Sequence, residues 1–170
     1  MEKNLGPGTQ NQQTNDQQTN DQQARNLEAY NYRKLEVWQQ SQEIAAQVVR
    51  LATGLPRDPA VAVISRQLVA SAGSVAANIA EGHGRFTFTA YRNHLSIAKG
   101  SACEADSWLD LLRRTGHISA EQEAALHQRL LSVVAVLTTK IRNLDARAKD
   151  AAQTRLREDE APYAVEADLD

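Results

Sequence analysis

The chain has 170 residues, enough for one domain, and a net charge of −2. Its single cysteine excludes an intrachain disulfide, so nothing requires an oxidising compartment. The chain begins without the apolar segment of a signal peptide, and no run of about eighteen apolar residues predicts a transmembrane helix. We therefore expect a cytoplasmic protein that does not bind membranes.

The two ends of the chain differ from its middle. Residues 1–29 repeat the unit TNDQQ, contain almost no large apolar side chain and are predicted to be a disordered tail. Residues 150–170 contain two arginines against seven acidic residues, a net −5, and are predicted to form a disordered acidic tail. Residues 1–29 contribute −2, so residues 30–149 carry a net +5. A basic core indicates an anionic partner, and an acidic tail competes with that partner for the same basic surface. Ordinary solubility charge explains the balance at least as well.

Apolar residues spaced three and four apart predict four helices, over 33–53, 59–81, 88–114 and 119–149. Gly54 ends the first helix, Thr87 is the predicted N-cap of the third, and Ser119 with Gln122 forms a capping box for the fourth. Connections of about five residues favour antiparallel neighbours. The predicted fold is all-α, an antiparallel up-down four-helix bundle.

The second predicted helix has small or apolar residues on nearly every face. Beside its core stripe it carries Val69, Ala70, Gly73, Ala76 and Ala77. Four helices in a small domain do not bury one of their number completely, so the additional apolar face predicts an interface between subunits.

The octet "NIAEGHGR" joins the second and third helices. Gly82 fits the left-handed residue that follows a helix end. Asn78 and Glu81 are expected to hold the turn, with Arg85 paired to Glu81. A role for His83 and Arg85 in binding a ligand or a nucleic acid is the alternative.

The sequence lacks the residue patterns of an enzyme. No Glu-x-x-His, His-Glu-x-x-His, Cys-x-x-Cys or phosphate-binding glycine loop occurs, which predicts no metal, no cofactor and no catalytic residue. Cys103 lies about 13 Å along its helix from His94, too far for a catalytic pair, and is expected to pack in the core. Trp38 and Trp108 are also expected in the core.

Gly100 lies in the middle of the third helix, where glycine costs about 1 kcal/mol relative to alanine. We expect another helix to approach closely there. Glu104, one turn later, is either a buried acid paired with an arginine or a residue at the rim of the bundle.

Three stretches identify a family. "YRKLEVWQQSQEIAAQVVRLATGLP", "QLVASAGSVAANIAEGHGR" and "YRNHLSIAKGSACEADSWL" resemble the bacterial four-helix-bundle family of 23S rRNA intervening-sequence proteins. That family also includes the accessory variability determinants of diversity-generating retroelements. The resemblance covers residues 30–144, the whole predicted bundle. It implies a ring-shaped homopentamer without enzymatic activity, and its retroelement members bind nucleic acid and associate with a reverse transcriptase.

The family's motif positions fall on eight residues of this chain, and except at Arg85 we expect them to be structural: Gln67, Asn78, Glu81, Gly82, Arg85, Gly100, Ser101 and Glu104. Three positions depart from the family pattern. Val69 and Ala70 stand where two arginines are common, and Ala90 replaces an acidic residue near the start of the third helix. The missing arginines weaken the case for a strong nucleic-acid surface on the second helix.

Basic residues nevertheless remain on the other helices. Arg92 and Lys99 are seven apart and are predicted to share one outward face of the third helix, and a cluster is predicted at the end of the fourth: Lys140, Arg142, Arg147 and Lys149. The candidate nucleic-acid-binding residues are Arg85, Arg92, Lys99, Lys140, Arg142, Arg147 and Lys149. Together they predict an oligomeric accessory protein that binds structured RNA or RNA with cDNA, and a reverse transcriptase as a second partner. The alternatives are a solvated helix face and a protein–protein scaffold without affinity for nucleic acid. The sequence does not distinguish a retroelement from an rRNA intervening sequence.

Overall fold

A computed structural model describes residues 31–159. They form a short 3-10 helix, η1 (Tyr32–Lys34), and four α-helices: α2 (Glu36–Thr53), α3 (Pro59–His83), α4 (Phe88–Arg114) and α5 (Ala120–Asp159). No strand occurs within this part of the chain. The prediction of an all-α fold with four helices is therefore confirmed, while the predicted tail over 1–29 lies outside the described residues.

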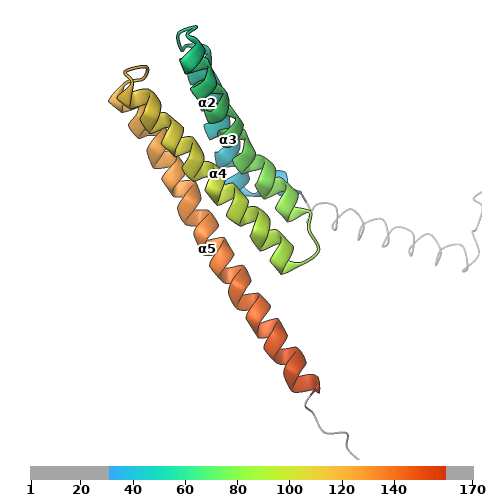
Figure 1. Ribbon diagram of the computed structural model, residues 1–170. Coiled ribbons are helices and arrows are strands. Elements are labelled where there is room, and N and C mark those ends of the chain that lie inside the picture. Colours follow the sequence, from blue (N-terminus) through green and yellow to red (C-terminus); the bar gives the residue numbers. More distant parts are fainter. Residues whose placement is uncertain (1–30, 160–170) are drawn as a thin grey trace, which may run out of the picture.

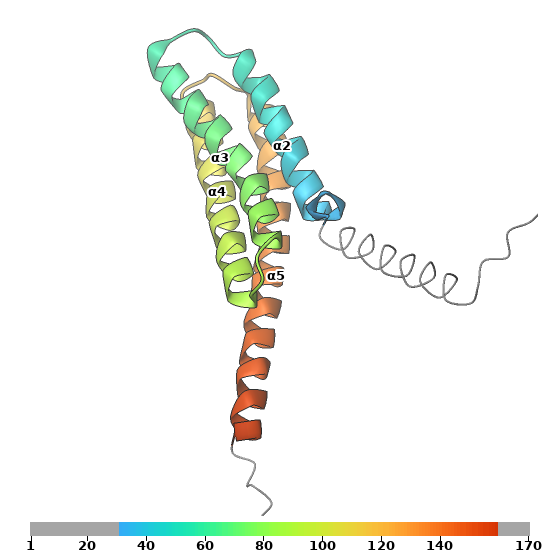
Figure 2. The same cartoon turned by 90° about the vertical axis from the view of Figure 1, so that its right-hand side faces the viewer.

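The helices pack side by side in chain order, as an up-down bundle requires (Figures 1 and 2). Helix α3 packs on α2 and α4, and α4 packs on α5. The contact between α2 and α5 closes the bundle and is the smallest of the four interhelical contacts. In the diagonal pairs, α2 with α4 and α3 with α5, no two Cα atoms of the described residues come within 8 Å of each other.

Both predicted N-terminal caps are present. The Thr87 hydroxyl accepts a hydrogen bond from the backbone N–H of Ala90 at 3.1 Å. At the start of α5, the Gln122 N–H donates to the Ser119 hydroxyl at 3.2 Å, and the Ser119 N–H donates to the Gln122 side chain at 2.9 Å. These reciprocal bonds are the predicted capping box and fix the α4–α5 turn.

Helix α5 is longer than the sequence predicted. It continues to Asp159, ten residues past the expected end at Lys149, and runs beyond the α3–α4 turn (Figure 1). Residues 150–159 contain neither glycine nor proline, and alanine, glutamine and arginine are strong helix formers. The prediction took acidic charge as a sign of disorder, but charge alone does not end a helix. The rest of the predicted acidic tail, 160–170, lies outside the described residues.

Helix α3 faces the core on one side and solvent on the other. Ala76 belongs to the core and Val69 packs against it, which corrects their assignment to the outer face. Ala70, Gly73 and Ala77 are exposed, as predicted.

By length and composition alone, α3 is long and apolar enough to cross a membrane, which the search for apolar runs had excluded. Core helices of bundles share this composition, and eight residues of α3 are buried against the neighbouring helices.

Candidate nucleic-acid interface

The octet's polar side chains link α3 to α4. Arg85 forms the predicted ion pair with Glu81, and its Nε donates to Nε2 of His94 at 3.1 Å. The Glu81 carboxylate lies 3.7 Å from the same histidine nitrogen. Asn78 does not hold the turn, as we had expected; its amide donates to the backbone oxygen of Ser74, one turn earlier in α3, at 2.8 Å.

Gly82 lies inside α3, and the prediction of a left-handed conformation is wrong. Among the described residues the one positive φ belongs to Gly116, at 74°. A Cβ on Gly82 would instead lie 2.7 Å from Cβ of His94 and 3.0 Å from Cδ2 of Tyr91. The missing side chain therefore lets α4 approach α3, with the Tyr91 ring edge-on to the His83 imidazole at 6.2 Å between centroids.

Two of the candidate cations already have anionic partners. Arg85 is paired with Glu81, and Arg92 of α4 lies 2.8 Å from the carboxylate of Asp145 of α5. Arg92 therefore faces the boundary between α4 and α5, which corrects its assignment to an outward face shared with Lys99. Both ion pairs are partly exposed, so they reduce the charge available to a partner without removing it.

The remaining candidates form no ion pair with any side chain in 31–155: Lys99, Lys140, Arg142, Arg147 and Lys149. Four of them lie on α5, where the sequence predicted one cluster. At 100° per residue, Lys140 and Arg147 share one side of the helix, and Arg142 and Lys149 share the opposite side. The predicted cluster is therefore two separate pairs.

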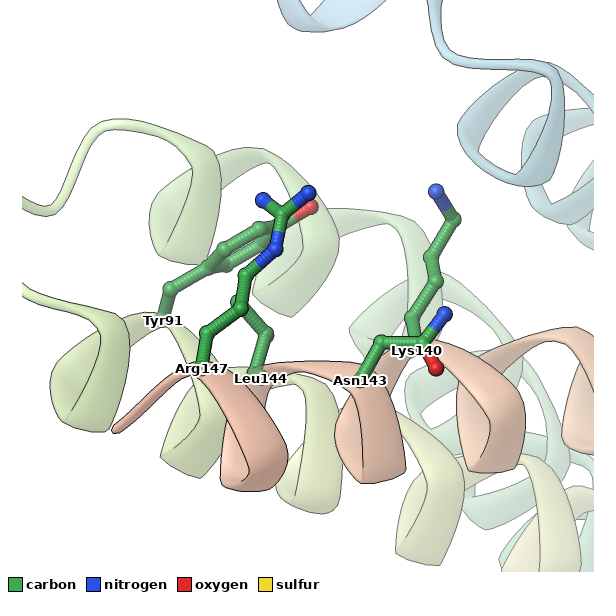
Figure 3. A pocket seen from close by; sticks show the side chains of 5 residues that line it. All are labelled: Tyr91, Lys140, Asn143, Leu144 and Arg147. Carbon is green, nitrogen blue, oxygen red and sulfur yellow. The ribbon is translucent and has the colours of Figure 1, made fainter. Parts of the chain in front are cut away.

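The first pair faces a hollow between α5 and α4 (Figure 3). Its walls are Tyr91 of α4 and Lys140, Asn143, Leu144 and Arg147 of α5, and its volume is about 230 Å³. Figure 3 shows Lys140, Asn143 and Arg147 projecting from the same side of α5, with Tyr91 of α4 among the residues that line the hollow. The arrangement places two cations, an amide and a phenol around one small space.

Tyr91 ties this hollow to the octet. Burial raises the pKa of the Tyr91 phenol above its ordinary value, which is already well above neutral pH, so the hydroxyl is protonated. Atoms Cδ2 and Cε2 of the ring lie beside Gly82, the ring centroid is 6.2 Å from that of His83, and the same residue lines the hollow. The octet therefore positions a wall of the basic hollow.

The other motif residues lie along the α3–α4 contact or on its outer edge. Ser101 is buried, and its hydroxyl donates to the Ser74 hydroxyl at 3.1 Å. Gln67 is exposed. Gly100 is exposed, and a Cβ added to it would have no atom within 4 Å, so no helix among residues 31–159 approaches it, contrary to expectation. Glu104 lies at the rim and accepts a hydrogen bond from Nε1 of Trp108 at 3.3 Å.

Three further expectations concern the core and metal binding. Trp38 and Trp108 are partly buried and pack against the core rather than within it. Cys103 is exposed, so its assignment to the core is wrong. Among the side chains that the structure describes, those of residues 31–155, no group of three or more histidine, cysteine, aspartate or glutamate residues is arranged to hold a metal ion.

Sequence reasoning missed Tyr91 and Asn143 as residues of the site. Tyr91 lies at the three- and four-residue apolar spacing of its helix, which is typical of a core residue, and uncharged Asn143 had no reason to be singled out. The spacing of Lys140, Asn143 and Arg147 in steps of three and four was the available signal, since such residues share one helix face.

Comparisons with known proteins agree with the fold. The model of the 23S rRNA-intervening sequence protein family matches residues 33–139. A crystal structure from Bacteroides thetaiotaomicron, described as a protein with unknown function from the S23 ribosomal protein family, is 31% identical to this chain, with a TM-score of 0.59. That match covers 62% of this chain and 97% of the other. No curated protein matches.

Proposed function

Because this chain belongs to the 23S rRNA-intervening sequence protein family, we propose that it is a non-enzymatic, cytoplasmic accessory protein that binds structured RNA, or RNA with cDNA, through basic side chains of α4 and α5. The family name supports a role connected with RNA. The residues supply the chemistry, because lysine and arginine neutralise phosphates and release counterions.

The observation that supports this function most directly is the set of unpaired cations on α5. Between positions 140 and 149 this helix presents four basic side chains without an anionic partner among the described residues. Arg113 and Arg114 lie in the last turn of α4, and by contrast both are paired with Asp110. Free positive charge is therefore available where α5 leaves the bundle.

We propose that the protein acts as a homopentameric ring, as the family resemblance implies. Gly73 and Gly100 support an assembly interface on the outer side of α3 and α4, because both are exposed and have open space where a side chain would stand. Mid-helix glycines weaken a helix, and close packing of another subunit offsets that cost. Five copies of a core with charge +5 would carry about +25 before the ends of the chain subtract from it.

A reverse transcriptase is the proposed protein partner if the gene belongs to a retroelement. The neighbouring genes test this part. A reverse transcriptase gene with a template repeat supports the partnership, and a position inside an rRNA operon contradicts it in favour of an intervening-sequence role.

Fluorescence anisotropy with a labelled RNA hairpin at several salt concentrations tests RNA binding by the full-length protein. We expect affinity to fall steeply as salt rises, with a log–log slope that reports the number of phosphates contacted. Polyglutamate of equal charge is the control for general attraction to anions. Equal binding of polyglutamate, or no RNA binding at low salt, would contradict the proposal and favour a protein scaffold.

A further inference from the structure

The hollow between α4 and α5 has the composition of a site for one phosphate group. We infer that Tyr91, Lys140, Asn143 and Arg147 bind a backbone phosphate in a single-stranded loop or end of RNA. The choice of RNA as the source of this phosphate rests on the proposed function. The binding chemistry rests on the hollow itself.

The donors around the hollow match the acceptors of a phosphate. Arg147 presents a planar fork of N–H groups, Lys140 a compact ammonium, and Asn143 an amide N–H₂. Neither cation is paired with a carboxylate in the described part of the chain. The Tyr91 hydroxyl is a further donor, because a phenol is protonated at neutral pH and burial raises the pKa of this one still further.

The nearest carboxylate on the same helix does not cancel this charge. Asp145 lies next to Leu144, but its Oδ1 is 2.8 Å from Nε of Arg92. Its negative charge is therefore already compensated across the α4–α5 boundary. Leu144 is 8% exposed and gives the hollow an apolar wall, which strengthens charge-assisted hydrogen bonds beside it.

Exposed aromatic rings near the hollow favour single-stranded RNA. Phe88 begins α4 one turn before Tyr91, so their Cβ atoms are about 5–6 Å apart. Phe88 is 48% exposed, and Phe86 in the preceding turn is 97% exposed. Unpaired bases stack on such rings, whereas the bases of a duplex are not available for stacking.

The hollow's volume limits what it holds. About 230 Å³ accommodates a phosphate with part of its sugar but not a folded RNA segment. The hollow therefore fixes one point of a strand, and the rest of the strand follows the neighbouring basic and aromatic side chains.

Two double variants of the full-length protein test the site. Lys140→Gln with Arg147→Gln removes both cations from the hollow. Arg142→Gln with Lys149→Gln is the matched control, because it removes the same charge at the same spacing from the opposite side of α5. Anisotropy is measured with a labelled single-stranded RNA at several salt concentrations, and thermal melting confirms that both variants fold.

We expect the first variant to bind about tenfold more weakly, and the control to lose no more than about threefold. The log–log salt slope of the first variant should decrease in magnitude by about 0.7, the value for one phosphate of a single strand. Equal losses in both variants would mean diffuse attraction, and no loss in the first would mean an unused hollow. Either result would overturn the inference.

A second measurement separates the site from the source of its phosphate. Inorganic phosphate is titrated into the full-length protein while NMR follows the side-chain amide of Asn143. If no RNA binds but phosphate shifts this signal, and the shift is lost in Lys140→Gln with Arg147→Gln, the site stands and RNA is rejected as its ligand. If no RNA binds and phosphate leaves the signal unchanged, the site is overturned together with the proposed function.

Discussion

Gly82 of α3 lies so close to His94 of α4 that a Cβ on the glycine would stand 2.7 Å from the Cβ of the histidine. The nearest atom of the Tyr91 ring would be 3.0 Å away. Both contacts involve atoms that cannot move independently of the α4 backbone or a packed ring. The glycine therefore sets the separation of the two helices where the octet ends.

Gly82→Ala should lower the free energy of unfolding by about 1–2 kcal/mol. Overpacking a tight contact costs about 1–3 kcal/mol, and the better helix propensity of alanine returns up to about 1 kcal/mol. Urea denaturation followed by circular dichroism measures the change. Gly84→Ala is the control, since its Cβ would have an ordinary 3.5 Å contact with a backbone oxygen. Equal stability of the Gly82 variant and the wild type would show that the helices separate at little cost.

The pair of His127 and Asp106 should make stability depend on pH. The hydrogen bond from Nδ1 of His127 to the Asp106 carboxylate, 2.7 Å long, raises the pKa of the histidine above its ordinary 6.5. The folded state therefore holds the proton more tightly than the unfolded state. This contribution is complete below about pH 6.5 and is lost as pH rises through the higher folded pKa.

The side chains of His127 and Asp106 are both about one-third exposed. Solvent screening therefore limits the contribution of this pair to the free energy of unfolding to less than about 1 kcal/mol. The free energy of unfolding, measured by urea denaturation, should be lower at about pH 8.5 than at about pH 5.5. His127→Gln is expected to remove this component of the fall. If the variant and the wild type show the same pH dependence of the free energy of unfolding, other titratable groups are responsible for it.

The sequence was informative where local chemistry decides the structure. Helix periodicity and side-chain caps depend on residues a few positions apart, so Thr87 and the Ser119–Gln122 box were predictable. The role of Gly82 was not, because it depends on His94, which lies twelve positions away on another helix. A glycine near a helix end is compatible both with a left-handed cap and with a close helix contact, and the sequence favoured the wrong one.

The candidate site shows the same limit. Basic residues were visible in the sequence, and helix periodicity alone separates Lys140 from Arg142. The acidic partner of Arg92, however, depends on how α4 and α5 are placed. Arg92 pairs with Asp145, fifty-three positions along the chain. Ion pairing across helices decides which charges remain available, and single-helix patterns do not contain that information.

Gly100→Leu should weaken the proposed assembly without unfolding the bundle. The position is exposed on α4 and has open space within the chain, so leucine fits the isolated subunit and improves its helix propensity. A neighbouring subunit packed against the glycine would be displaced by the larger side chain. Light scattering should show a smaller particle, and circular dichroism should show unchanged helix content.

Ser107→Leu is the control for the Gly100 variant, because Ser107 is also exposed on α4 and lies seven residues further along the helix. We expect it to have a smaller effect on particle size, since serine does not mark a close helix contact. If Gly100→Leu leaves the particle size unchanged, the glycine does not mark the interface.

Truncation after Lys149 should strengthen RNA binding while leaving the bundle folded. Residues 150–170 carry a net −5, and residues 151–155 of α5 are exposed, so the loss of the segment removes repulsion of phosphates and little packing. We expect affinity for a labelled RNA to rise severalfold at low salt and the difference to shrink as salt screens the charges. The melting temperature should change little, which separates an electrostatic effect from a structural one.

A full-length variant with Glu158, Asp159 and Glu160 changed to glutamine is the charge control for this truncation. It should reproduce part of the gain in affinity with the chain length unchanged, because these residues supply three of the seven acidic charges. If truncation strengthens binding and this variant does not, the segment obstructs RNA by its bulk rather than by its charge. If neither change alters affinity, the acidic segment does not compete with RNA for the basic residues of α5.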